Sequence, residues 1–213
     1  MSERAAIPGL FISVEEEADR RAVEELTREA FWNRYAPGGL EQYMLHLLRK
    51  EPDFEPWHSL VARYDDAVIG HVFSSPCRVE LDAGGFAPAL TIGPICTLPA
   101  VFLRGIGGAL MREAIREAKK RGVRALFLTG DPRYYHRFGF VSASSFGVRY
   151  PGVPAGEEAA FFMALPLYKS ALDGCEGVYR ASPLFEVREG PDFEAYDSSF
   201  PPRKKLRLPG QLQ

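Results

Sequence analysis

Three glycines and an arginine stand just before a helical pattern of apolar residues, and together they could hold a phosphate. Gly105, Gly107 and Gly108 follow Arg104. The apolar residues after them recur at helical spacing, which predicts a helix N-terminus: Leu110, Met111, Ala114, Ile115 and Ala118. Unpaired N–H groups and the positive end of the helix dipole favour an anion there, and glycines let it approach the backbone closely. A plain tight helix start is the alternative.

The sequence of this glycine stretch does not match either of two common phosphate-binding motifs. A dinucleotide fingerprint needs G-x-G-x-x-G after an early strand and an acidic residue about 20 positions later, whereas a P-loop needs Gly-Lys-Ser/Thr. Neither pattern occurs here. The glycines instead follow an apolar strand expected over 89–98, in which Pro94 removes one ladder hydrogen bond and predicts a bulge or splay.

The stretch from Pro99 to Leu110 resembles the acetyl-CoA loop of the GCN5-related N-acetyltransferases (GNAT), V-x-P-x-x-Q/R-x-x-G-x-G/A. It departs from that pattern at Thr97, where the family prefers Val, and at Phe102, where it prefers Gln or Arg. A second stretch, Gly130–Phe140, spells G-D-P-R-Y-Y-H-R-F-G-F. It resembles the Y-x-x-x-G-F segment after the fifth strand of the same family, in the narrower form of the predicted acetyltransferases related to the bacterial protein YhbS.

The resemblance implies an α/β fold, a GNAT-type sandwich around a mixed, mostly antiparallel sheet. That sheet splays between its fourth and fifth strands to admit the pantetheine arm of CoA. We expect the N-acetyltransferase domain over 9–168 and a C-terminal extension with a polar, Pro-rich tail over 169–213. The basic run at the end of this tail could contact a phosphate or an acidic partner, and a solvated tail is the alternative.

Acetyl-CoA (coenzyme A) is the cosubstrate that the resemblance implies, with no metal. The implied cofactor-binding residues lie at the strand end and in the loop: Ile95, Cys96, Thr97, Leu103, Arg104, Gly105, Ile106, Gly107, Gly108 and Ala109. The implied reaction is direct attack of a primary amine, from a small molecule or a peptide, on the thioester. A tyrosine donates a proton to the departing thiolate; counting four residues back from Gly139 gives Tyr135, with Tyr134 as the alternative.

The proton that the amine must lose has no obvious acceptor. The strand over 89–98 carries no carboxylate, where the family often has one. Glu29, His71 and Glu80 are the options that the sequence offers, and a water relay is another. The rival function is a catalytically weak or inactive CoA-binding sensor or interaction domain with the same fold. Phe102 and the missing carboxylate favour this rival, whereas the two tyrosines favour an enzyme.

The composition of the chain excludes several classes of protein but does not identify a substrate. At 213 residues and 46% hydrophobic content the chain can bury a full core, and its net charge of −2 gives no basic field for nucleic acid. No basic leader or apolar run of the ~20 residues that span a bilayer is seen, so we expect a cytoplasmic protein without membrane contact. The three cysteines fit neither a disulfide framework nor a zinc site. The sequence leaves open whether the protein is a monomer or a homodimer.

Apolar spacing predicts the elements that position these motifs. A strand is expected within 8–13, followed by a helix that Ser13 and Glu16 would cap. A second helix is expected from residue 40 to residue 48, and a hairpin turns at 65–66. A short helix is expected over 167–172.

Overall fold

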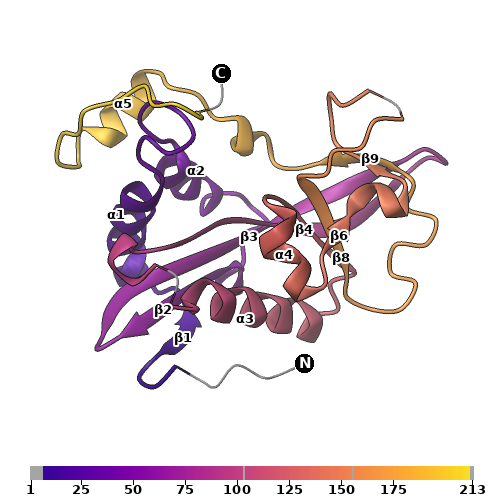
Figure 1. Cartoon of the computed structure of the whole chain (residues 1–213), viewed down its shortest axis with the longest axis horizontal. Helices are drawn as coiled ribbons and strands as arrows, with labels where there is room; N and C mark the ends of the chain where they lie inside the picture. Colours follow the sequence, from indigo (N-terminus) through magenta and orange to yellow (C-terminus); the bar gives the residue numbers. More distant parts are fainter. Residues whose placement is uncertain (1–6, 103, 155, 212–213) are drawn as a thin grey trace. The chain divides into compact units, whose positions relative to one another are not determined.

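The computed structural model describes residues 7–102, 104–154 and 156–211 (Figure 1). In chain order, its strands and α-helices are β1 (Phe11–Val14), α1 (Arg20–Phe31), α2 (Glu41–Leu48), β2 (Ser59–Tyr64), β3 (Ala67–Leu81), β4 (Phe86–Thr97), α3 (Ile106–Lys120), β5 (Ala125–Thr129), α4 (Pro132–Tyr135), β6 (Val141–Ser142), β7 (Val148–Arg149), β8 (Phe162–Pro166), β9 (Gly177–Arg180) and α5 (Pro191–Asp197).

The strands are hydrogen-bonded in the order β1-β2-β3-β4-β5-β8-β6, and β9 pairs with β3 and β7. The β4–β5 and β7–β9 pairs are parallel. The β1–β2, β2–β3, β3–β9, β5–β8 and β6–β8 pairs are antiparallel. These pairings confirm the predicted α/β class with a mixed, mostly antiparallel sheet.

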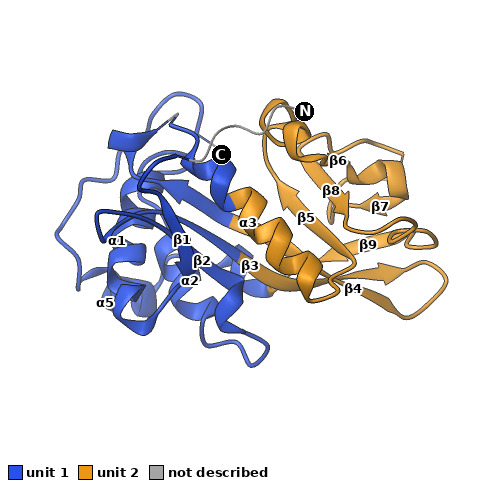
Figure 2. Ribbon diagram, turned by 90° about the horizontal axis from the view of Figure 1, so that it is seen from below, with its two compact units in different colours: residues 1–73, 94–110, 183–213 blue, residues 74–93, 111–182 orange. Residues whose placement is uncertain are grey.

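The chain divides into two compact units, coloured separately in Figure 2. The first comprises residues 1–73, 94–110 and 183–213, and the second comprises residues 74–93 and 111–182. The chain therefore passes between the units four times, within β3, β4 and α3 and again after residue 182. This division into units does not test the domain boundary expected at residue 168, which stays a prediction.

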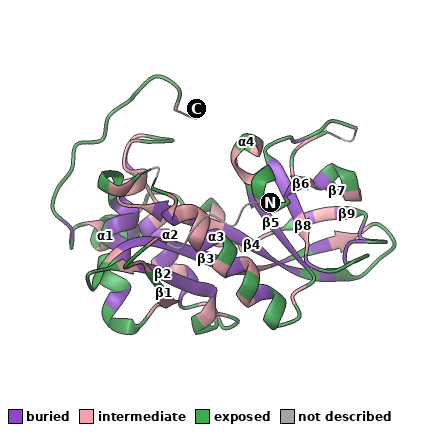
Figure 3. Cartoon of the chain, turned by 60° about the horizontal axis from the view of Figure 1, so that its bottom comes forward, coloured by how far each residue is buried: buried purple, intermediate pink, exposed green. Residues whose placement is uncertain are grey.

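The core of the first unit lies between its sheet and the inner faces of α1 and α2. Val23 and Leu45 are fully buried there against Val61 and Phe73 of β2 and β3. Arg21, Glu25 and Glu29 of α1 are exposed, whereas its polar residues Glu24 and Arg28 are buried, and Figure 3 shows both exposed and buried stretches on this helix. The burial of Val23 and Leu26 is what the helical apolar spacing predicted, and the buried polar residues are an addition to it.

The core of the second unit is rich in aromatic rings. Phe127 of β5 and Phe162 of β8 stack with ring centroids 5.5 Å apart, and Tyr179 of β9 packs against both. The Tyr179 hydroxyl donates to Thr91 Oγ1 at 2.7 Å, so its polar end is satisfied inside the core.

Two local predictions are wrong. The capping box before α1 is formed by Glu16 and Asp19, because Ser13 is still paired in β1. Residues 167–172 form turns rather than a short helix, with Ala171 N donating to Tyr168 O.

The C-terminal segment, residues 191–211, is part of the first unit and is held against α1 by hydrogen bonds, while the residues of its basic run, 203–207, are exposed, as expected for a solvated tail. Arg28, only 3% exposed, binds both carboxylate oxygens of Asp197 at 2.9 and 3.1 Å and the Pro201 carbonyl at 3.0 Å. Trp32 Nε1 donates to the Lys204 carbonyl at 3.1 Å, and Phe200 is 4% exposed. The aromatic turn after α1, Phe31–Tyr35, thus helps to hold this segment.

Candidate active site

The glycine loop leaves β4 and enters α3 through a short, hydrogen-bonded path. Leu98 N donates to Ile69 O at 3.0 Å, and Phe102 N donates to Pro99 O at 3.1 Å. The first helical bond of α3 runs from Ala109 N to Gly105 O at 3.0 Å. Helix geometry therefore leaves the N–H groups from Gly105 to Gly108 without a partner inside α3.

The predicted cofactor-binding residues of the loop lie together at this helix end. Ile106 is buried, Arg104 is exposed, and Gly105, Gly107, Gly108 and Ala109 are half-buried. Leu103 lies outside the described residues. Since Ala109 N already donates within the helix, the N–H groups that suit a phosphate are those from Gly105 to Gly108.

Close packing of α3 on β3 fixes the direction of this helix end. A Cβ at Gly70 of β3 would lie only 3.0 Å from Leu110 and 3.1 Å from Ile106. The absence of a side chain at Gly70 therefore lets the first turns of α3 approach the strand. The backbone donors are held by packed secondary structure.

Strand β4 is irregular where the sequence predicts it to be. Gly93 has a φ of 149°, a conformation that residues with a side chain rarely adopt, and Pro94 follows it. The parallel ladder with β5 pairs Leu90 with Leu126 and Thr91 with Phe127, just before this point. This confirms an irregularity at the glycine–proline pair.

The three predicted residues at the end of β4 differ in burial. Ile95 and Thr97 are half-buried, and Cys96 is buried with its Sγ 3.6 Å from Thr27 Oγ1 of α1. Burial raises the pKa of the Cys96 thiol to about 12, so the group stays neutral at ordinary pH. Any contribution of Cys96 to a cofactor would therefore come from its main chain.

The tyrosine motif forms the short helix α4. Asp131 is its N-cap, with Oδ1 accepting from Arg133 N at 2.9 Å, and Pro132 occupies the first turn, as predicted. Tyr134 and Tyr135 are both half-buried and make an edge contact with ring centroids 4.9 Å apart.

The two tyrosines have different surroundings. Burial raises the pKa of Tyr134, an effect that Arg137 and Arg112 oppose, and the Arg137 guanidinium lies 4.3 Å from the Tyr134 ring centroid. Tyr135 packs edge-on against Phe140 at 6.1 Å. These tyrosines belong to the second unit, whereas the glycine loop belongs to the first.

Changing Gly130 to Ala should disturb Tyr135 and cost about 1–3 kcal/mol of unfolding free energy. A Cβ at Gly130 would lie 2.3 Å from Tyr135 Cε2, so the tyrosine ring must move. Thermal and urea unfolding of Gly130→Ala measure the loss. An unchanged unfolding free energy would show that the ring is not held against this glycine.

The three residues that the sequence offers as general bases have different surroundings in the structure. His71 is fully buried, with Nε2 2.8 Å from Ser59 Oγ. Its pKa is held well below its ordinary value, first by burial and then by Arg49, so it is a neutral structural residue. Glu80 is half-buried, and its pKa is lowered mainly by a hydrogen bond from Arg180. Glu29 pairs with Arg203 on the surface of the first unit.

An open groove of about 960 Å³ runs along α1 in the first unit. Ala22, Leu26, Val68 and Leu98 give it apolar lining, and Glu29 adds a carboxylate. Leu98 directly follows the strand segment Ile95–Thr97. The groove therefore reaches the end of β4 from the α1 side and is large enough for a small-molecule ligand.

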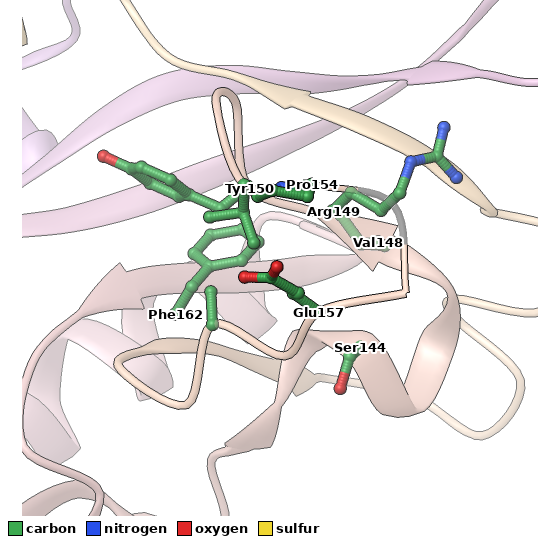
Figure 4. Close-up of a pocket in the computed structure, with 9 residues that line it drawn as sticks. Ser144, Val148, Arg149, Tyr150, Pro154, Glu157 and Phe162 are labelled. Atoms are coloured by element: carbon green, nitrogen blue, oxygen red, sulfur yellow. The ribbon is translucent and has the colours of Figure 1, made fainter.

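A second cavity, in the second unit, is far smaller. Figure 4 shows it between Tyr150, Phe162 and Glu157. Its volume of about 20 Å³ holds roughly one water molecule. It is therefore not a substrate site.

One carboxylate near β4 was missed by the sequence analysis. Glu41, the first residue of α2, is half-buried and electrostatically coupled to Cys96. Its sequence context gives no signal, because an acidic residue in the first turn of a helix is common.

The chain belongs to the GNAT acetyltransferases, since the family model of the acetyltransferase (GNAT) domain matches residues 12–143. That match contains the glycine loop and the tyrosine motif, so it confirms the resemblance from which the site was predicted. No curated protein matches the chain.

Solved structures support the same assignment. The chain is similar to the GNAT family N-acetyltransferase YhbS from Escherichia coli in complex with CoA, with a TM-score of 0.73, 25% identity, and coverage of 87% of this chain and 97% of that one. It is also similar to a GNAT family acetyltransferase from Brucella melitensis in complex with acetyl-CoA, with a TM-score of 0.65, 28% identity, and coverage of 83% and 97%.

Two further findings concern the described residues only. None of their helices is both long and apolar enough to cross a membrane. Nor do they contain a group of three or more His, Cys, Asp or Glu side chains that could hold a metal ion.

Proposed function

We propose that this protein is an acetyl-CoA-dependent N-acetyltransferase that acetylates a primary amine of a small molecule or a peptide. The observation that carries the proposal is the start of α3. There the main-chain N–H groups from Gly105 to Gly108 have no partner within the helix, and Arg104 adds a positive charge next to them in the chain. The relatives from E. coli and B. melitensis, which were solved with CoA and acetyl-CoA, support a CoA ligand for this cradle.

The chain offers groups for three requirements of acetyl transfer: stabilising the oxyanion, protonating the leaving thiolate and admitting the amine. Backbone N–H groups near Ile95–Thr97 suit the oxyanion that develops on the thioester carbonyl, and such fixed donors contribute roughly 3–4 kcal/mol. The hydroxyl of Tyr135 is the proposed donor to the departing CoA thiolate, with Tyr134 as the alternative. The groove along α1 is the proposed path of the acceptor amine.

Thiol release from acetyl-CoA in the presence of a library of primary amines tests the proposal. We expect release that depends on one class of amine, and an acetylated product of matching mass. Calorimetry with CoA is run beside it. Tight CoA binding without turnover of any amine would favour the rival function, a CoA-binding sensor or interaction domain, and absence of both would refute the cradle.

Changing Phe102 to Gln should leave CoA affinity equal to or tighter than that of the wild type. Phe102 is 57% exposed and its backbone N–H bonds to Pro99, so the ring contributes little to the loop conformation. A glutamine would add the polar contact that the GNAT pattern expects. Calorimetry with CoA measures the change, and a large loss of affinity would show that the phenyl ring itself contacts the ligand.

A further inference from the structure

The groove along α1 is lined by residues from four segments of the first unit. Helix α1 contributes Ala22, the start of β3 contributes Val68, and the chain after β4 contributes residues 98–100. The fourth segment is the C-terminal one, which contributes Pro201 among others. It lies outside residues 12–143, which the family model matches. The C-terminal segment therefore adds a wall to the groove that the family match does not include.

This C-terminal wall is held in place by two arginines of α1. Arg28 binds the carbonyl of Pro201. Arg21 Nη2 donates to the carbonyl of Ser199 at 2.8 Å, and the Arg21 guanidinium carbon lies 3.7 Å from the ring centroid of Phe200. Phe200 is buried by these contacts, whereas Pro201 is exposed. The ring of Pro201 is therefore fixed in position and accessible to a ligand in the groove.

The charged side chains of the groove are largely paired with one another or with neighbours. The exception among the described residues is Asp66, which is exposed before β3, where solvent screens its charge. A second charge on a ligand would therefore have to break an existing ion pair or rely on this screened carboxylate. The other six of the seven charged lining residues form the pairs Asp19–Arg63, Glu25–Arg21, Arg28–Asp197 and Glu29–Arg203.

The lining carries one negative charge in excess, since four carboxylates and three guanidinium groups contribute to it. The two partners outside the lining, Arg21 and Asp197, cancel each other. One excess negative charge favours a ligand with a single positive charge. The exposed apolar residues of the groove favour an uncharged hydrocarbon body on that ligand: Ala22, Ala67, Pro99, Ala100 and Pro201.

We infer that the acceptor is a primary monoamine carried on an uncharged, apolar body, and that Pro201 of the C-terminal segment is a specificity-determining residue for it. This inference rests on the proposed N-acetyltransferase function. It narrows the acceptor from primary amines in general to one chemical class, selected by the groove along α1.

Three acceptors that share one hydrocarbon chain test the class: hexylamine, hexamethylenediamine and aminocaproate. The chain ends in a methyl group in the first, a second ammonium in the second and a carboxylate in the third. We expect kcat/KM for hexylamine to exceed that for each of the others by about 10-fold or more, because a second charge must be desolvated beside groups that are already paired. Equal or higher values for either charged acceptor would overturn the class.

Two substitutions place a new carboxylate in the groove from different segments. Ala22→Glu adds it from α1 and Pro201→Glu adds it from the C-terminal wall, and both positions are exposed. We expect each to reduce the preference for hexylamine over hexamethylenediamine by about 10-fold, mainly through KM, with CoA affinity unchanged by calorimetry. Ala195→Glu adds the same charge at an exposed position of α5 outside the lining, and should match the wild type.

The outcomes separate this inference from the function on which it rests. A wild type that binds CoA but acetylates no amine would overturn the proposed function, and the acceptor class with it. An active enzyme whose folded Ala22→Glu and Pro201→Glu variants both keep the wild-type preference would overturn only the role of the groove. A change of preference in Ala22→Glu but not in Pro201→Glu would overturn the role of the C-terminal wall. Thermal unfolding of each variant establishes that it is folded.

Discussion

Replacing Gly107 with Asp should weaken acetyl-CoA binding by about 10²-fold or more while the protein stays folded. Gly107 lies in the first turn of α3, among the N–H groups proposed to hold the pyrophosphate. The new carboxylate would place a negative charge and extra atoms where the phosphates must approach, but an acidic residue is favourable to the helix itself. Calorimetry with acetyl-CoA measures the affinity, and thermal unfolding measures the fold.

A matched substitution separates charge from position. Gly190, the residue before α5, has open space around its backbone, so Gly190→Asp adds the same charge at the start of another helix. We expect this control to bind acetyl-CoA as the wild type does. If the folded Gly107→Asp protein also binds with wild-type affinity, the phosphate cradle is in the wrong place.

Changing Tyr135 to Phe should lower kcat by about 10²-fold with little change in CoA affinity. The substitution removes only the hydroxyl, so the contacts of the ring with Phe140 and Tyr134 remain. Loss of a positioned proton donor affects the transition state more than ligand binding, which predicts a fall in kcat. Steady-state kinetics with any accepted amine gives kcat and KM separately.

Tyr134→Phe is the natural comparison, since the two rings are neighbours on one short helix. Adjacent side chains on a helix diverge by about 100°, so both hydroxyls are unable to serve the same sulfur atom in the same way. We expect Tyr134→Phe to keep most of the activity. If Tyr134→Phe loses activity while Tyr135→Phe stays active, Tyr134 is the proton donor. If both variants stay active, solvent protonates the CoA thiolate.

Local features of the site were predictable because their causes are local. Asp131 and Pro132 specify the start of α4 through capping and a fixed φ, and the glycines before α3 specify a close backbone approach. The irregularity of β4 follows from Pro94, which cannot donate to a ladder. Each of these rests on residues within one or two turns of each other.

The rest depends on contacts between distant parts of the chain. Glu41 has the appearance of an ordinary first-turn glutamate, and only in the folded chain does its charge help to raise the pKa of the Cys96 thiol of β4. His71 has the appearance of a candidate base until its strand neighbours bury it completely. The basic run of the tail is exposed, as its composition predicts, but the structure alone shows that Trp32 and Asn33 hold its backbone by donating to the Lys204 carbonyl. Composition and spacing carry no information about which distant segments meet.

The clamp between Arg28 and Asp197 also constrains the order in which the protein can be completed during synthesis. The two residues are 169 positions apart, yet both belong to the first unit. That unit begins with early residues and includes residues 191–211, so its last contacts must wait until the whole second unit has been translated. Closing so long a loop is entropically costly and tends to slow folding. The outer face of α1, including the site that Phe200 covers, is therefore exposed on the nascent chain for most of its synthesis, when chaperone binding there would protect it from aggregation.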